Sequence, residues 1–197
     1  MSTEQDKNED RRAFFRVNDA VRLQIRQVPD EQIDALLERL EANVGSGFTV
    51  MSSLASISAE MAVSMRRIEN ASPDVAAYLK ALDRKIEVLG RAFIAQETDL
   101  AAEVAHPVNL SAGGMSVLVN ESYPEDAGVE VKMLLFPSFT GVLTYGKVVE
   151  CSELADDQRD EGYSHRMRIE FTHMREQDRD ILIRHVLRCQ SMELRKK

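Results

Sequence analysis

Three arginines lie within six residues near the start of the chain, at Arg11, Arg12 and Arg16. Residues 11–28 hold five arginines and one aspartate, a local charge of +4 in a chain whose net charge is −8. Guanidinium groups form paired hydrogen bonds with phosphate oxygens and with the O6/N7 edge of guanine, and their planes stack on bases. This stretch therefore predicts one half of a site for an anionic purine nucleotide.

A second polar stretch lies more than ninety residues later and contains Asn109, Ser111, Gly113 and Gly114. Glycines let the backbone approach a ligand and expose its amide groups. An asparagine amide can bond a base or a sugar, and a serine hydroxyl can bond a phosphate oxygen. We expect this stretch to form a turn between two strands and to supply the other half of the site. Taken alone, either stretch is more often a solvated face or an ordinary turn.

Strand patterns occur at both ends of the chain. Val21, Leu23 and Ile25 alternate with polar residues, which predicts a half-buried strand that Pro29 ends. After about residue 104, five short segments separated by turn-rich pieces indicate an antiparallel barrel or sandwich. A single strand cannot fold alone, so the first strand must join the later ones. Residues 175–194 predict a closing amphipathic helix.

Three helices are predicted between the first strand and the others. Asp30 is expected to cap a helix that runs to about Val44. A second helix is expected from about Phe48 to Glu69, and a third begins at Pro73. The helices therefore form an insertion in a β-domain, and their lengths suit an arm that runs out and back.

The third helix carries the sharpest periodicity in the sequence, with apolar residues spaced alternately four and three apart. These seam residues are Val75, Leu79, Leu82, Ile86, Leu89 and Phe93. Such a heptad seam predicts a coiled coil between subunits. The other interpretation is an amphipathic helix that packs on its own barrel or on the second helix. The mixed residue types leave dimer and tetramer both open.

Composition sets further limits. The chain has 197 residues, of which 44% are hydrophobic and 29% charged, as expected of a soluble globular protein. The net charge argues against DNA binding through a basic surface. Cys151 and Cys189 are expected to be free thiols in a reducing compartment. Residues 1–10 are polar and are expected to form a disordered tail without the apolar stretch of a signal peptide, so a cytoplasmic location is predicted.

The run from Phe48 to Met65 holds Glu60 as its only charge, but it also holds five serines. It is therefore a poor candidate for membrane insertion. We expect the helix that contains it to be buried against other helices.

The two polar stretches together resemble the signature of the PilZ domain family. Arg12 and Arg16 match the spacing RxxxR, and Asn109, Ser111 and Gly114 match (D/N)xSxxG. The similarity covers residues 11–28 and about 104–194. It implies a six-stranded antiparallel barrel with a C-terminal helix, and binding of the bacterial second messenger cyclic di-GMP, often as a stacked pair.

The resemblance also assigns roles to the two stretches. It implies that Arg12 and Arg16 clamp guanine and phosphate, that Asn109 contacts guanine or ribose, and that Ser111 contacts phosphate. Gly114 permits the turn. The expected ligand-binding residues are Arg11, Arg12, Arg16, Asn109, Ser111, Gly113 and Gly114.

The long gap between the motifs departs from the usual family pattern. It looks like the atypical subgroup, found in proteobacteria, whose barrel is interrupted by long helices that assemble subunits. The expected fold is α+β, with a split barrel over residues 11–29 and 104–197 and a helical insertion over residues 30–103. The expected function is a homo-oligomeric cyclic di-GMP receptor whose ordered arginine loop is read by a downstream protein.

Two other classes of function fit the sequence less well. An enzyme is not expected, because Ser111 lacks a GxSxG elbow and no catalytic partner can be identified. No metal or other cofactor is expected, since the four histidines show no ligand pattern, and the one-turn spacing of His185 and Cys189 is more typical of packing. The stronger rival is an adaptor in which the barrel docks a protein, the arm sets the oligomeric state, and no nucleotide binds.

Overall fold

The computed structural model describes residues 15–42, 47–97, 100, 104–155 and 162–195. The predicted tail over residues 1–10 and the predicted ligand residues Arg11 and Arg12 lie outside the described residues.

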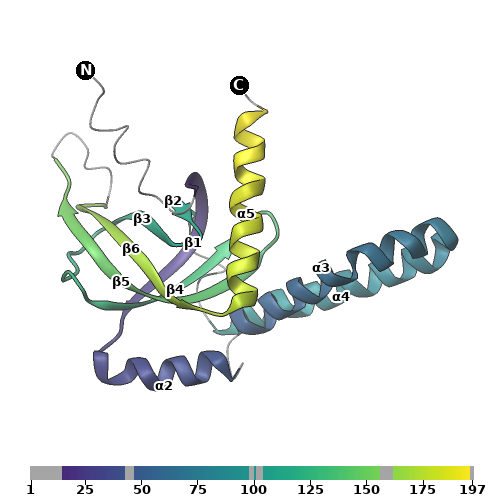
Figure 1. Ribbon diagram of the computed structural model, residues 1–197, viewed down its shortest axis with the longest axis horizontal. Helices are drawn as coiled ribbons and strands as arrows, with labels where there is room; N and C mark the ends of the chain where they lie inside the picture. Colours follow the sequence, from purple (N-terminus) through teal and green to yellow (C-terminus); the bar gives the residue numbers. More distant parts are fainter. Residues whose placement is uncertain (1–14, 43–46, 98–99, 101–103, 156–161, 196–197) are drawn as a thin grey trace.

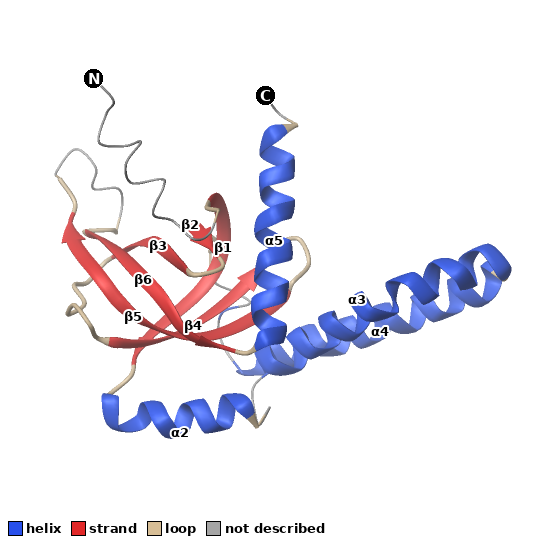
Figure 2. Cartoon of the chain, in the orientation of Figure 1, coloured by secondary structure: helices blue, strands red, loops and turns tan. Residues whose placement is uncertain are grey.

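Six antiparallel strands form a closed barrel (Figures 1 and 2). They are β1 (Val17–Gln27), β2 (His106–Ser111), β3 (Gly114–Val119), β4 (Gly128–Leu135), β5 (Thr140–Glu153) and β6 (His165–Met174). Around the barrel their order is β1-β2-β3-β6-β5-β4. The prediction of a six-stranded antiparallel barrel is confirmed.

The first strand closes the barrel by pairing with two others along different halves of its length. Residues 17–21 pair with β2, and residues 22–27 pair with β4. Val17 and Val21 are buried in the barrel core, with Leu23 and Ile25 packed against it. Burial of this apolar face fixes the register of β1. As a result, the residues at the start of β1 lie beside the end of β2.

A C-terminal helix, α5 (Glu176–Leu194), completes the barrel core. Its residues Leu182, Val186 and Cys189 belong to the same buried cluster as the inward-facing side chains of the strands. Figure 1 shows α5 standing against the barrel beside the base of the helical insertion. The predicted closing helix is therefore present.

Three helices follow β1, namely α2 (Asp30–Glu41), α3 (Gly47–Ala71) and α4 (Pro73–Glu97). The start of α3 packs on the outside of the barrel, where Phe48 is fully buried. A side chain at Gly141 would come within 2.7 Å of the Phe48 ring, so this glycine permits the close approach. A second apolar cluster forms there from Val28, Leu40, Phe48, Met51, Leu100, Leu134, Leu143 and Tyr145.

Helices α3 and α4 form an antiparallel hairpin, here called the arm, which projects away from the barrel (Figure 1). The low-charge helix is α3, and it was expected to be buried against other helices. In the single chain this expectation is wrong for most of the length of α3. An 18-residue window of the helix over Phe48–Ala71 has a mean hydropathy of 1.2, and only 22% of that window is buried. Its length and composition alone would allow it to cross a membrane, which by itself is weak evidence. The helix packs on α4, which carries many charges, and an exposed ion pair between Lys80 and Glu69 links the two.

The seam residues of α4 are mostly left uncovered in the single chain. Helix α4 faces α3 with small residues, since Ala76 is buried and Gly90 lies against Met51. Leu79 and Leu82 are half-buried. The remaining seam residues are 45–62% exposed, and these are Val75, Ile86, Leu89 and Phe93. The interpretation in which this seam packs entirely within its own chain is therefore not supported.

Two helix boundaries differ from the sequence-based predictions. Pro29, not Asp30, is the N-cap of α2, because Pro29 is extended (φ −61°, ψ 140°) and its carbonyl oxygen accepts a hydrogen bond from the Gln32 amide. The helix ends at Glu41 rather than near Val44, which lies outside the described residues.

A buried polar cluster joins the base of the arm to α5. Arg175 donates hydrogen bonds from Nε and Nη2 to the two carboxylate oxygens of Asp178, both at 2.9 Å, and Nη2 also bonds the Ser52 hydroxyl. Asp178 is fully buried. Its desolvation outweighs the bonds from Arg175 and Ser52 and raises the pKa of this carboxyl. The arm and α5 are thus held together by groups that water does not reach.

Candidate functional site

The two motifs predicted from the sequence meet at the pairing of β1 with β2. Arg16 donates a hydrogen bond from Nη1 to Asn109 Oδ1 at 3.2 Å, across 93 residues of sequence. Asn109 Nδ2 in turn donates to Asn18 Oδ1 at 2.9 Å. Asn18 and Asn109 are direct partners in the strand register. The sequence-predicted Arg16 and Asn109 are therefore brought together, and Asn18 is added to them.

The second motif lies mainly in strands rather than in a turn, which corrects the prediction. Asn109 and Ser111 belong to β2, and Gly114 begins β3, so only two residues form the connection. Ser111 is 3% exposed, and its hydroxyl donates to the Gly114 carbonyl oxygen at 3.0 Å. In this conformation the Ser111 hydroxyl closes the turn and does not face the solvent. The contact with phosphate that the resemblance implies for Ser111 stays a prediction.

The two glycines of this motif hold the connection against β6. The Gly113 carbonyl oxygen accepts a hydrogen bond from the Phe171 amide at 3.0 Å. A Cβ atom at Gly114 would collide with the backbone oxygen of Ile169. Only glycine therefore allows β3 to pair with β6 at this point. Both glycines position the strands that carry the polar side chains.

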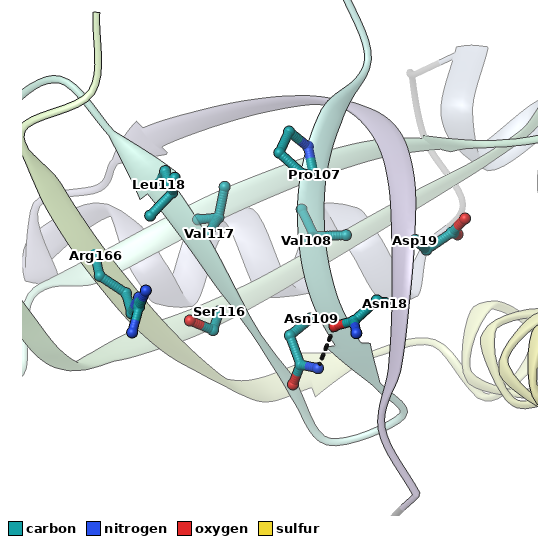
Figure 3. A pocket seen from close by; sticks show the side chains of 9 residues that line it. All are labelled: Asn18, Asp19, Pro107, Val108, Asn109, Ser116, Val117, Leu118 and Arg166. Atoms are coloured by element: carbon teal, nitrogen blue, oxygen red, sulfur yellow. Dashed lines mark hydrogen bonds between the residues drawn. The ribbon is translucent and has the colours of Figure 1, made fainter. Parts of the chain in front are cut away.

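A groove of about 430 Å³ lies on the outer face of the barrel beside these residues (Figure 3). It is lined by Asn18, Asp19, Pro107, Val108, Asn109, Ser116, Val117, Leu118 and Arg166. The strand register places Asn18, Asn109 and Ser116 in one row, since Asn109 pairs with both of the others. Amide and hydroxyl groups along such a row can bond the polar edges of a base or a sugar.

Besides Asp19, sequence reasoning missed three polar residues of the groove, Asn18, Ser116 and Arg166. Each of these three residues stands at a polar position of a strand with alternating apolar and polar residues. This alternation was the only feature of the sequence that could have pointed to them. The alternation predicts that such residues face outward, but it does not say which strands are neighbours. The pairing of β1 with β2, and of β3 with β6, brings them to the same groove.

One wall of the groove is anchored to α5 by a carboxylate–imidazole pair. His185 Nε2 and Asp19 Oδ2 lie 2.6 Å apart, and the His185 side chain is 3% exposed. Arg188 Nη2 lies 3.2 Å from His185 Nδ1. Because guanidinium can only donate, Nδ1 accepts and Nε2 carries the proton that bonds Asp19. This pair fastens β1 to α5 next to Asn18.

The ligand atoms of Asp19, His185 and Cys189 lie within 4.8 Å of one another, as they do in some metal sites. The Arg188 contact argues for a hydrogen-bonded cluster instead, because a metal on Nε2 needs Nδ1 as a protonated donor. Burial raises the pKa of the Cys189 thiol, with a further contribution from Asp19, which keeps the thiol protonated. Sequence reasoning noted His185 and Cys189, but Asp19 comes from a strand 166 residues away.

Asp19 gives the fold a dependence on pH. Burial by itself raises the pKa of its carboxyl, but the bonds from His185 and from the Ala20 amide outweigh this and leave the pKa below its ordinary value. The bonds to Asp19 thus stabilise the fold above the unfolded-state pKa of about 4, and this stability is lost as pH falls through the lower folded value.

We expect Asp19→Asn to lower the free energy of unfolding at pH 7 by about 1 kcal/mol, a modest value because solvent screens the partly exposed carboxylate. The deficit should persist from pH 7 down to about 5 and shrink as pH falls below about 4. Urea unfolding followed by circular dichroism measures it. Glu150→Gln, which removes an exposed partner of Arg168, serves as the control. A deficit that stays constant with pH would contradict the role given to the Asp19 carboxylate.

Comparisons with known proteins support the same fold. A model of the PilZ domain family matches residues 84–188, which run from within α4 to within α5 and include β2 to β6. No curated protein matches the sequence.

Several solved structures are similar to this chain, among them the following three. The first is a pathogenic protein from Xanthomonas campestris, described as a new tetrameric PilZ domain self-assembled via an unusual helical bundle. It has a TM-score of 0.57 and 15% identity, and the match covers 92% of this chain and 91% of that chain. The Bacillus subtilis inhibitor of motility has a TM-score of 0.45 and 13% identity. That match covers 92% of this chain and 52% of the Bacillus subtilis chain. The PilZ domain of Escherichia coli YcgR with c-di-GMP has a TM-score of 0.35 and 16% identity. That match covers 49% of this chain and 80% of the YcgR domain chain. At these identities only the first likeness carries an argument, and it concerns the fold.

Proposed function

Because this chain belongs to the PilZ domain family, whose members bind cyclic di-GMP, we propose that it is a cyclic di-GMP receptor that assembles through its arm. The ligand binds at the groove between β1, β2, β3 and β6. Its binding orders the arginine-rich segment before β1 over the barrel and creates a surface that a downstream protein in the cytoplasm reads.

The observation that carries the proposal is the hydrogen bond between Arg16 and Asn109. It joins the two motifs, which are far apart in the sequence, on one face of the barrel. Arg16 supplies a cation and a flat fork of donors, and the Asn18–Asn109 pair supplies amides of fixed orientation. These groups suit the phosphates and guanine edges of a cyclic dinucleotide.

Isothermal titration calorimetry of the full chain with cyclic di-GMP tests the receptor proposal. We expect heat of binding at micromolar concentrations and competition by unlabelled ligand in a fluorescence assay. If neither heat nor competition is seen at tens of micromolar ligand, the receptor proposal fails and the adaptor hypothesis replaces it. The buried Ser111 hydroxyl, bonded to the Gly114 carbonyl oxygen, is the observation that favours that alternative, because it leaves one predicted phosphate contact unmade in this conformation.

The exposed seam of α4 supports assembly of several copies. Isolated apolar residues are common on surfaces, but a row of large ones along a projecting helix is typical of an interface. The Xanthomonas campestris structure of similar fold is described as a tetramer self-assembled via a helical bundle. We propose that a second copy of this chain covers the seam.

The double variant Ile86→Glu, Leu89→Glu tests this assembly. Both side chains are exposed within one chain, at 45% and 62%, so the monomer should still fold while buried carboxylates exclude association. We expect a mass near one chain in size-exclusion chromatography with light scattering, against a multiple for the parent. Val88→Glu is the matched control, because Val88 is 65% exposed but lies off the seam. An unchanged mass in the double variant would contradict the role of the seam.

A further inference from the structure

Arg166 stands in the groove, although neither motif includes it. It lies on β6 opposite Leu118 of β3, and Arg168, two residues later, lies opposite Ser116. Residues two apart on a strand face the same side, so Arg166 and Ser116 are diagonal neighbours about 7 to 8 Å apart at their backbones. A long arginine side chain spans that distance. Figure 3 shows Arg166, Ser116, Asn109 and Asn18 following one another along the groove.

The two arginines of β6 differ in their partners. Arg168 donates from Nη1 to Glu150 Oε2 at 2.8 Å, so its charge is paired on the barrel surface. Among the residues that the structure describes, the Arg166 side chain makes no hydrogen bond or ion pair, while its backbone lies between β3 and β5. Its guanidinium group is exposed and keeps its donors for a ligand. Of the two arginines of β6, Arg166 is therefore the one whose guanidinium group can bond a ligand in this groove.

The surroundings of Arg166 suit a base better than a phosphate. Pro107 and Leu118 line the same part of the groove and offer apolar surface on which a base plane can lie. Ser116 adds a hydroxyl that has no hydrogen-bond partner among the described residues. A guanidinium fork beside a stacked base can bond O6 and N7 of guanine together. Arg16, beside Asn109, provides a separate cation at the other side of the row.

We infer that Arg166 determines specificity for guanine, by donating two hydrogen bonds to the O6/N7 edge of a base that packs on Pro107 and Leu118. This inference rests on the proposed receptor function and extends it, because it adds a residue of β6, outside the two motifs, to the residues that select the base. Adenine carries an amine donor in place of O6, so the same arginine disfavours adenine.

Competition binding with cyclic di-GMP and cyclic di-AMP, using the full chain, tests the inference. We expect Arg166→Ala to weaken cyclic di-GMP binding by about tenfold or more, and to affect cyclic di-AMP much less, so that discrimination between them falls. Arg166→Lys keeps the charge but not the fork, and it should lose discrimination as the alanine variant does. Arg168→Ala is the matched control and should bind both nucleotides as the parent does.

The outcomes separate the inference from the receptor proposal. If the parent binds cyclic di-GMP and Arg166→Ala binds it equally well, the inference fails while the receptor proposal stands. Equal losses for both nucleotides would show a phosphate contact, which also overturns the inference. If the parent binds no cyclic di-GMP, both fail together. Circular dichroism confirms that the variants fold, which the exposed position of Arg166 leads us to expect.

Discussion

Replacing Arg16 with alanine is expected to weaken cyclic di-GMP binding roughly 10- to 100-fold, the loss that follows from removing a hydrogen-bonded cation. The effect should exceed that of one lost contact with the ligand. Arg16 also bonds Asn109, which bonds Asn18, so the variant loosens two amides that the ligand is proposed to meet. Calorimetry at fixed ionic strength measures the change.

Two further variants make the result for Arg16 specific. Arg26→Ala removes the same side chain at the other end of β1, where Arg26 is paired with Glu130 at 3.4 Å, and it should leave binding unchanged. Arg16→Lys keeps the charge but not the flat fork, and it should recover only part of the affinity. If Arg16→Ala bound the nucleotide within twofold of the parent, the groove would not be the binding site.

Replacing Asp178 with alanine is expected to lower the free energy of unfolding by about 3 kcal/mol, because it leaves the charge of Arg175 buried without its carboxylate. For a chain of this size such a loss corresponds to a fall in melting temperature of roughly 6 to 12 °C. Ser52 of α3 belongs to the same cluster, so the attachment of the arm to α5 should weaken as well. Thermal and urea unfolding measure the stability.

The buried pair itself is expected to contribute little net stability. Desolvation raises the pKa of Asp178, which shows that the carboxylate gains less from Arg175 than it loses by burial. The double variant Arg175→Met, Asp178→Leu should therefore recover much of the loss. Asp180→Ala is the matched control, since Asp180 lies on the same helix and forms only an exposed pair with Arg184 at 3.9 Å. Equal stability of the Asp178 and Asp180 variants would contradict this account.

The sequence was sufficient to predict the type and order of the elements. Alternation at Val21, Leu23 and Ile25 predicted a half-buried strand, and the structure has β1 there. The five later strands, the arm and the closing helix were predicted in the same way. Such patterns are local, because the period of apolar residues depends on the geometry of one helix or strand.

The orientation of individual side chains was less predictable. Ser111 was expected to face a ligand, yet its side chain is buried and its hydroxyl donates to the Gly114 carbonyl oxygen across the turn. The low-charge helix was expected to be buried, yet it lies on the projecting arm and only 22% of its most apolar window is buried. Both depend on what packs beside the element, which a local pattern does not record.

The sequence by itself therefore determined the two polar motifs, the barrel and the helical insertion between them. Only the tertiary structure decided that Arg16 meets Asn109, that Asp19 meets His185, and that Arg166 lies in the same groove. The physical reason is closure of the barrel. Strand neighbours are fixed when all six strands bury their apolar faces together. The Arg16–Asn109 contact spans 93 positions of sequence and the Asp19–His185 contact spans 166, so both follow from the whole core and not from any one segment.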